Sequence, residues 1–235
     1  MPLFLSNRET ELREKMDERD CELITLRNTY EQFGTINKLL GGWDKIYRDW
    51  IRPVLLKESG LASILDIGCG GGDIIRALSK MTKEDGLDVS FTGIDPDLRA
   101  IDFSREKNLD PFSEFFALTS GELVDMQQKY TVVISNHLLH HLDDEDLKNI
   151  CNDAVQLSAQ LVIFSDIERS DIGYGCFRAI APIIFKNSFI AEDGMISIRR
   201  SYRSDELREK LPPGWVVHTQ FPFRLLAIHK KNRDE

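Results

Sequence analysis

The segment Ile64–Asp73, which reads ILDIGCGGGD, constrains the fold of this chain more than any other feature. Residues 64–67 predict a buried strand, and the glycines after them predict a tight turn that opens a helix. Glycine has no side chain and adopts positive φ, so backbone amides in such a turn can approach a nucleotide-like ligand closely. Asp95 ends a second expected strand, 89–95, about 20 residues or slightly more downstream, where the hydroxyl pair of a ribose would lie. Together these features predict a nucleotide-binding α/β domain.

The side chains of the glycine turn narrow the class of nucleotide. A dinucleotide fingerprint needs a small residue three places after its second glycine, where the helix packs against the strand. Gly68 and Gly70 fill the two glycine positions, but the third position holds the charged Asp73, which disfavours NAD or FAD. No Gly-Lys-Ser/Thr follows the glycines, so a nucleoside triphosphate loop is also disfavoured. S-adenosylmethionine fits what remains, because it carries a ribose and an adenine but no pyrophosphate.

Over about residues 60–230 the chain resembles class I S-adenosylmethionine-dependent methyltransferases. Residues 66–70 (DIGCG) match the first motif of that family, and residues 92–95 (TGID) match the second. The segment 132–142 (VVISNHLLHHL) resembles the fourth strand of the family and its following loop. Its His-His-Leu end is most similar to enzymes that act on small molecules, including quinone-biosynthesis methylases.

Two further segments, 166–170 and 197–202, resemble a bacterial subgroup linked to phenolic or polyketide-type acceptors. Methylases of nucleobase or amide nitrogens in this superfamily carry an Asn-Pro-Pro-aromatic loop after the fourth strand. Here residues 135–138 read SNHL, without a proline, so methylation of DNA bases or of glutamine is disfavoured. We expect a small-molecule acceptor, with transfer to oxygen favoured over transfer to carbon and nitrogen left open.

The resemblance implies a cofactor site at the carboxyl ends of the strands, where open α/β sheets bind ligands. Asp66 would face the amino group of S-adenosyl-L-methionine, and Asp95 would accept hydrogen bonds from both ribose hydroxyls. The alternative role of Asp95 is to cap the helix that begins near residue 97. Thr119 and Ser120 would lie near the adenine, and Asn136 and His137 near the methionine part. The remaining expected cofactor residues are Gly68, Cys69, Gly70 and Pro96, and the product would be S-adenosyl-L-homocysteine.

The chemistry requires few catalytic groups, because the sulfonium already activates the methyl group and the acceptor mainly needs to be positioned. A phenol or enol acceptor also needs a base. His140 and His141 are candidates, since imidazole exchanges protons near neutral pH, and Asp166 and Glu168 are competing bases. The alternative is that the His-His-Leu loop only caps the next helix and packs. The candidate substrate-binding residues are Arg169, Arg199 and Tyr202.

The alternation of strands and helices predicts a Rossmann-like α/β fold. We expect a mostly parallel seven-stranded sheet with helices on both faces and an antiparallel C-terminal edge strand. Residues 61–235 would form this methyltransferase domain, with an active-site insertion at about 167–200, and residues 1–60 would form an N-terminal helical lid. The expected strands are 64–67, 89–95, 114–118, 131–135, 160–165, 215–219 and 224–229, and the expected helices include 71–82, 97–107, 143–157 and 172–186.

Composition limits the partners. The chain has 30 Lys and Arg against 39 Asp and Glu, a net charge of −9, which disfavours nucleic acid as a partner. The 4 cysteines form no Cys-x-x-Cys pair, so neither a zinc site nor a disulfide framework is expected, and no metal-ligand spacing is visible. No signal sequence or apolar run of about 20 residues is found, so we expect a cytoplasmic monomer or homodimer that does not bind membranes.

Three other functions stay open at this level. The chain could be a module that binds the cofactor without transferring the methyl group, and the absence of a pocket beside the methyl group would support that. It could be an NAD-dependent oxidoreductase, against which Asp73 argues. It could also methylate a protein or an RNA, and the net charge argues against RNA.

Overall fold

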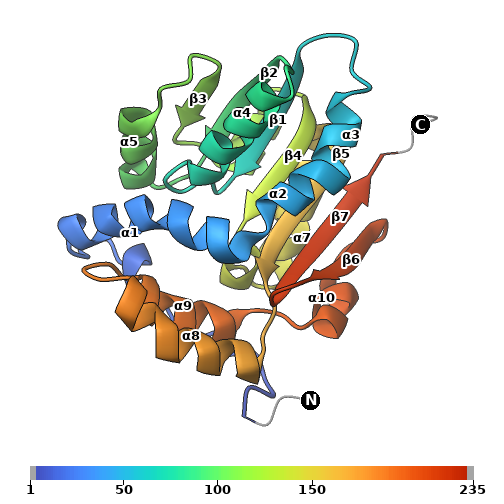
Figure 1. The fold of residues 1–235 in the computed structure, drawn as a ribbon. Coiled ribbons are helices and arrows are strands. Elements are labelled where there is room, and N and C mark those ends of the chain that lie inside the picture. The colour runs from blue at the N-terminus through green and yellow to red at the C-terminus, as the bar shows by residue number, and fades with distance from the viewer. Residues whose placement is uncertain (1–3, 232–235) are drawn as a thin grey trace.

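A seven-stranded sheet organises residues 4–231, which are the residues described by the computed structural model (Figure 1). The strand order is β3-β2-β1-β4-β5-β7-β6. The strands are β1 (Ala62–Ile67), β2 (Val89–Ile94), β3 (Ser113–Phe116), β4 (Tyr130–Asn136), β5 (Ser158–Ile167), β6 (Trp215–Gln220) and β7 (Arg224–Lys230).

The direction of the strands confirms the expected sheet. β1 pairs in parallel with β2 on one side and with β4 on the other, so that Leu65 lies between Thr92 and Val133. β3 and β5 extend the parallel part, while β7 runs antiparallel to β5 and β6 antiparallel to β7. The fold is therefore Rossmann-like and mostly parallel, and its antiparallel part is the C-terminal hairpin.

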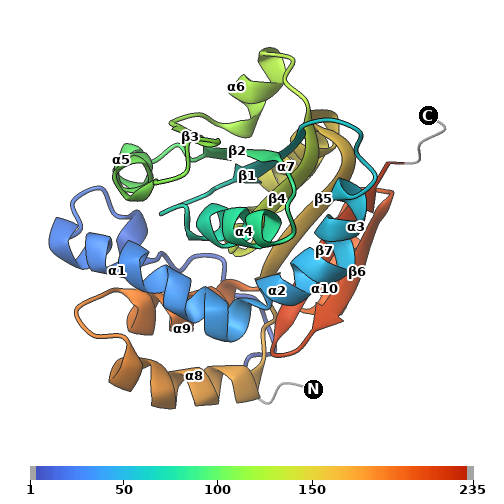
Figure 2. The same cartoon turned by 45° about the horizontal axis from the view of Figure 1, so that its top comes forward.

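Helices cover both faces of the sheet, as Figure 2 shows from a second direction. Alternate residues of a strand point to opposite faces. Ile64 accordingly packs in one apolar cluster with residues of α4 such as Leu78, and Leu65 packs in another with residues of α7 such as Leu147. The helices that follow β1 to β4 are α4 (Asp73–Glu84), α5 (Leu98–Lys107), α6 (Ser120–Asp125) and α7 (Asp144–Leu157), and α10 (Ser204–Lys210) precedes β6.

The region before β1 is helical, as predicted. Its α1 (Leu23–Ile36) lies along the carboxyl edge of the sheet, whereas the part after Gly42 packs on one sheet face through Trp43, Ile46 and Ile51. Gly42 has a φ of 65°, a left-handed conformation that turns the chain between these parts. The further elements are the π-helical segments Asn37–Gly41 and Tyr47–Ile51, α2 (Trp43–Ile46) and α3 (Arg52–Leu55). A role of residues 1–60 as a lid stays a prediction.

Two helices follow β5 and lie beside α1 at the carboxyl edge, below α1 in Figure 1. They are α8 (Asp171–Ile184) and α9 (Ile190–Arg200). The sequence predicts a helix over 172–186, which matches α8, but it does not predict α9. The apolar periodicity of α9 is interrupted by Gly194, which has no side chain and so leaves room for the ring of Phe177. The two helices contact each other and enclose the edge of the sheet at which a ligand would bind.

The N-terminal arm, residues 4–17, is fixed against the body of the protein. The sequence predicts an exposed helix or a loosely held arm over 7–20, and this prediction is wrong for the first part of that stretch. Arg8 donates hydrogen bonds to the carbonyl oxygens of His140 (3.0 Å) and Leu142 (2.9 Å). The buried Arg169 donates to the carbonyl oxygen of Leu5 (3.0 Å) and pairs with Glu206. Carbonyl acceptors of this kind leave no signal in the sequence.

We expect Arg169→Met to lower the free energy of unfolding by about 2–3 kcal/mol, because Glu206 and the arm carbonyls lose a buried charged donor. Urea denaturation followed by circular dichroism measures this loss. Arg48→Met is the matched control, since Arg48 is 66% exposed and pairs with Asp49 at the surface, and it should keep the wild-type midpoint. An unchanged midpoint for Arg169→Met would contradict the role given to this side chain.

Candidate functional site

A cavity of about 490 Å³ lies at the carboxyl ends of the parallel strands. Its wall combines the glycine loop after β1, the end of β2, the loop after β4 and parts of α1, α8 and α9. Among the residues predicted from sequence, those that line it are Asp66, Gly68, Cys69, Gly70, Asp95, Pro96, Asn136, His137, His140, His141 and Glu168. One cavity thus brings most of the expected cofactor residues and the two expected histidine bases together.

The glycine loop has the conformation that its sequence predicts. Gly68 and Gly70 have φ values of 70° and 50°, which favour glycine. The amides of Gly68 and Cys69 donate to the carbonyl oxygen of Ile94, which ties the loop to β2. A Cβ atom built on Gly70 would meet nothing within 4 Å. The loop therefore leaves open space on its cavity side, where a ligand can approach the backbone.

Asp95 connects the glycine loop to the turn after β2. Its carboxylate accepts hydrogen bonds from the amides of Gly70 (3.0 Å) and Asp97 (2.9 Å). The cap of α5 is Asp97, which accepts from the amide of Arg99, so capping is not the role of Asp95. Burial raises the pKa of Asp95 despite these two donors. A carboxylate in this position, on the cavity wall, suits the hydroxyl pair of a ribose.

Three carboxyl groups surround the glycine loop, and that of Asp66 is fully buried. Burial raises the pKa of Asp66 well above its usual range, and Asp73 and Asp95 add to that rise. Oδ1 of Asp66 has no hydrogen-bond partner among residues 4–231. Asp73, which the sequence analysis used only against NAD, also lines the cavity, and it accepts a hydrogen bond from Asn37 (2.9 Å). Carboxyl groups that lack a cationic partner suit a positively charged ligand with N–H donors. S-adenosylmethionine has two positive groups, its ammonium and its sulfonium, and the ammonium also supplies N–H donors.

The loop after β4 holds Asn136 and His137 on the cavity wall. Oδ1 of Asn136 accepts hydrogen bonds from Trp43 (3.2 Å) and from Arg224 (2.7 Å). His137 has a left-handed φ of 59°, and its Nε2 lies 2.9 Å from Arg224. Burial, with Arg224 nearby, lowers the pKa of His137 well below its usual range, so the ring is neutral and accepts from the guanidinium. The sequence analysis missed Arg224, because an arginine beginning an edge hairpin carries no local signal.

Thr119 and Ser120 are not among the described residues that line the cavity. Thr119 caps α6 in a capping box with Glu122, and the hydroxyl of Ser120 donates to Asp153 (2.6 Å). Both hydroxyls thus have structural partners around α6. Helix capping also explains why a threonine and a serine stand between β3 and α6. The structure therefore does not support their predicted place beside an adenine.

The three candidate substrate residues also lie outside the cavity wall. Arg169 pairs with Glu206, and Arg199 pairs with Glu9 at 2.6 Å. The hydroxyl of Tyr202 accepts a hydrogen bond from Arg8 (2.6 Å). Each of these groups fixes the N-terminal arm or α10, and a role in binding substrate stays a prediction. The acids that neutralise the two arginines are distant in sequence and could not be assigned from it.

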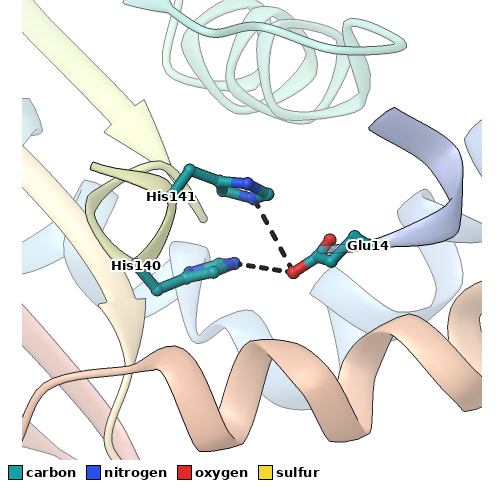
Figure 3. A group of neighbouring side chains, drawn as sticks. All are labelled: Glu14, His140 and His141. Carbon is teal, nitrogen blue, oxygen red and sulfur yellow. Dashed lines mark hydrogen bonds and ion pairs between the residues drawn. The ribbon is translucent and has the colours of Figure 1, made fainter. Parts of the chain in front are cut away.

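Glu14, His140 and His141 form a polar corner of the cavity (Figure 3). The two histidines come from the loop after β4, and Glu14 comes from the N-terminal arm. Oε1 of Glu14 lies 3.2 Å from Nε2 of His140 and 3.8 Å from Nε2 of His141. The sequence analysis did not single out Glu14, because it stands in a charged stretch without apolar periodicity.

His140 and His141 differ in their surroundings. His140 is buried, and its Nδ1 lies 2.8 Å from Asp166, whose other oxygen accepts from the His140 amide (2.9 Å). Although burial opposes it, the carboxylates of Asp166 and Glu14 raise the pKa of His140 to about 9. The pKa of Glu14 is lowered to about 2 by these histidines and by Ser197, against the effect of burial. Both ring nitrogens of His140 are therefore occupied, whereas the ring of His141 is 26% exposed.

Asp166 itself is buried and does not line the cavity among the described residues. Burial raises the pKa of this carboxyl, but His140 outweighs that effect and holds the pKa below its usual range. Asp166 thus orients His140 and is not placed to take a proton from an acceptor. Glu168 lines the cavity, and burial raises its pKa.

The corner also contains metal-ligand types. Ligand atoms of Glu14, His140 and His141 lie within 4.8 Å of one another, and so do those of His137, His140 and Asp166. The sequence analysis expected no metal from the spacing of the chain. That reasoning could not include Glu14, which lies 126 positions from His140.

The rest of the cavity is apolar. Its walls come from α1, the segment Asn37–Gly41, α8, α9 and the turn before β7. The apolar lining side chains include Phe33, Ile36, Leu39, Leu40, Phe177, Ile180, Ile184, Phe185, Ile190, Ile198 and Phe223. Ile180 and Leu40 are also partly exposed, at 53% and 41%, so this apolar wall continues to the surface.

Comparison with known proteins agrees with this geometry. Residues 64–160 match the family of methyltransferase domains. The release factor glutamine methyltransferase of Streptococcus pneumoniae is 26% identical over 144 residues, which cover 61% of this chain and 47% of that protein. The ubiquinone biosynthesis O-methyltransferase of Brucella ovis is 30% identical over 112 residues, covering 47% of this chain and 43% of that one. The matches span less than half the length of these relatives.

Solved structures share the fold. The plantazolicin methyltransferase BpumL, in complex with a monoazolic desmethylPZN analog and SAH, matches with a TM-score of 0.55 and 18% identity, over 90% of this chain and 95% of that one. The magnesium protoporphyrin IX methyltransferase ChlM of Synechocystis PCC 6803, with bound SAH, matches with a TM-score of 0.53 and 15% identity, over 93% and 92%.

Residues 64–160 therefore match methyltransferase domains, and the strand order and the acid-lined glycine loop agree with that match. Both of these solved structures contain SAH. Within residues 4–231, no helix combines the length and the apolar character that crossing a membrane requires.

Asp95→Ala should weaken the binding of S-adenosylhomocysteine at least tenfold, because the ribose loses its acceptor and Gly70 loses its support. Calorimetric titration measures the affinity. Asp97→Ala is the matched control: it removes the cap of α5, which costs about 1 kcal/mol of stability, but leaves the affinity unchanged. Equal affinities for wild type and Asp95→Ala would refute the assignment.

Proposed function

We propose that this chain transfers the methyl group of S-adenosylmethionine to an oxygen atom of a small aromatic, phenolic or polyketide-like acceptor. The observation that carries the proposal is the continuity of one cavity from the acid-lined glycine loop to the polar corner and the apolar walls. Cofactor, reacting oxygen and acceptor skeleton would each find the matching chemistry there. The similarity to ubiquinone biosynthesis O-methyltransferases agrees with an oxygen acceptor.

The chain's own residues would mainly position the acceptor. S-adenosylmethionine supplies the activated methyl group, and an in-line displacement needs the acceptor oxygen held against it. The apolar side chains of α1, α8 and α9 would bind the acceptor's rings and exclude water. The polar corner would contact the hydroxyl and remove or share its proton, and His141 is the more accessible of its two histidines.

The relatives also include a methylase of a protein, the release factor glutamine methyltransferase. The loop after β4 argues against that substrate class here. Its residues 135–138 read SNHL, without a proline, and the one side-chain amide in this segment is engaged, because Oδ1 of Asn136 accepts hydrogen bonds from Trp43 and Arg224. An apolar cavity of about 490 Å³ also favours a compact aromatic acceptor over an extended peptide.

The proposal is tested by incubating the purified chain with methyl-labelled S-adenosylmethionine and a panel of phenols, catechols and enolic polyketide lactones. If acid cleavage of the product's ether bond releases the labelled methyl group, the transfer was to oxygen. If the label stays in the product after this treatment, the transfer was to carbon. Binding of S-adenosylhomocysteine with no transfer to any member of the panel would favour a binding module and contradict the proposal.

We expect His141→Ala to lower kcat at least tenfold, and by about 100-fold if it acts as a general base, because the acceptor oxygen loses its polar contact. The affinity for S-adenosylhomocysteine should not change, since His141 contacts Glu14 and Asp17 and not the glycine loop. His218→Ala on the exposed face of β6 is the control. If His141→Ala kept the wild-type kcat, the polar corner would have no role in the reaction.

A further inference from the structure

We propose that Glu14, His140 and His141 bind one divalent cation at the polar corner. Its role in catalysis rests on the proposed function: the cation would contact the acceptor oxygen. The existence of the site does not rest on it, because the site is defined by side chains alone (Figure 3).

The distances fit ligands that share one ion. Ligands held at about 2.1 Å in tetrahedral or octahedral geometry lie about 3.0–3.4 Å apart. Oε1 of Glu14 lies 3.2 Å from Nε2 of His140 and 3.8 Å from Nε2 of His141. All three residues line the cavity, so an ion there could be reached by a ligand. Small side-chain rotations would complete the coordination.

Each histidine has a carboxylate on its other ring nitrogen. Nδ1 of His140 lies 2.8 Å from Asp166, and Nδ1 of His141 lies 3.2 Å from Asp17. A carboxylate on Nδ1 fixes the tautomer that leaves Nε2 free to bind a metal, and metal-binding histidines nearly always have such a partner. Both Nε2 atoms here face the same oxygen of Glu14. This double arrangement is the observation that carries the proposal.

The backbone that carries these side chains is also held in place. Nε of Arg200 donates to the carbonyl oxygen of His140 (3.1 Å), and its Nη2 donates to that of His141 (3.0 Å). Arg8 donates to the carbonyl oxygen of His140 as well (3.0 Å). The two histidines are therefore positioned before any ion binds, which a metal site requires.

The second group of ligand types, His137, His140 and Asp166, is a weaker candidate. Nε2 of His137 lies 2.9 Å from the guanidinium of Arg224, whose charge would repel a cation. Both oxygens of Asp166 are engaged by His140, and Asp166 does not line the cavity. The ion therefore belongs between Glu14 and the two Nε2 atoms.

Two imidazoles and one carboxylate suit Zn²⁺, Mn²⁺, Co²⁺ or Fe²⁺ and leave positions open toward the cavity. With the ion bound, His140 and His141 would act as ligands and not as bases, and an acceptor hydroxyl whose oxygen contacts the ion would lose its proton to solvent more readily. The oxygen's electron pair then forms the bond to the methyl carbon, and the carbon–sulfur bond breaks with its electron pair going to sulfur. The ion leaves this balance unchanged. An ion at this position would therefore favour acceptors that carry a hydroxyl or a pair of neighbouring oxygens.

The test is a titration of the chelator-treated full chain with Co²⁺, followed by visible absorption and by calorimetry. Wild type should bind one equivalent with micromolar affinity. Glu14→Gln and His141→Ala should each weaken binding at least tenfold, and Asp17→Asn should weaken it by up to about tenfold. Glu9→Gln on the same arm and His218→Ala on β6 are matched controls and should bind as wild type does.

Two results would overturn the site: no saturable binding of one equivalent by wild type at millimolar Co²⁺, or equal affinity in wild type, Glu14→Gln and His141→Ala. His141 is partly exposed, so its variant should fold even if Glu14→Gln disturbs the arm. Titration of the same samples with S-adenosylhomocysteine separates the two proposals. Cofactor binding without Co²⁺ binding removes only the metal site, whereas Co²⁺ binding without any methyl transfer removes only the proposed function.

Discussion

The parallel pairing of β1 with β2 and β4 is the constraint on which the rest of the structure depends. Pairs such as Leu65 with Thr92 and with Val133 align these strands so that they end at one edge of the sheet. The glycine loop, Asp95 and the loop after β4 meet there although they are far apart in sequence. Helices cover both faces of the sheet, so this edge is where α1, α8 and α9 can enclose a ligand.

The N-terminal arm depends on buried arginines whose acceptors are mostly backbone carbonyls. Arg8 and Arg200 both donate to the loop after β4, and Arg169 donates to the arm itself. A buried guanidinium has five N–H donors to satisfy, so several carbonyls must converge on each one. The same contacts that satisfy these arginines place Glu14 beside His140. The geometry of the polar corner is therefore a consequence of how the arm is anchored.

The sequence predicted the features that depend on a local pattern of residues. It could not predict contacts between residues that are far apart along the chain. The strands and the glycine loop follow from apolar runs and glycines, and Asp95 follows from its place at a strand end. Glu14 could not be predicted, because only the folded chain brings it to His140. Arg169 and Arg199 look like free cations in the sequence, since the acids that pair with them lie far away along the chain. Helix α9 was missed because a glycine interrupts its apolar spacing.

The carboxyl groups at the two ends of the cavity have pKa values shifted in opposite directions. Burial raises the pKa values of Asp66, Asp73 and Asp95 around the glycine loop, where too little positive charge faces them. At the polar corner the pKa of Glu14 falls to about 2, because the histidines offset its burial. A ligand with a positive charge beside the glycine loop would stabilise the ionised form of these three carboxyl groups. A neutral ligand would leave their raised pKa values uncompensated. The acids therefore favour a cationic ligand, while the glycines alone only show that there is room for a nucleoside.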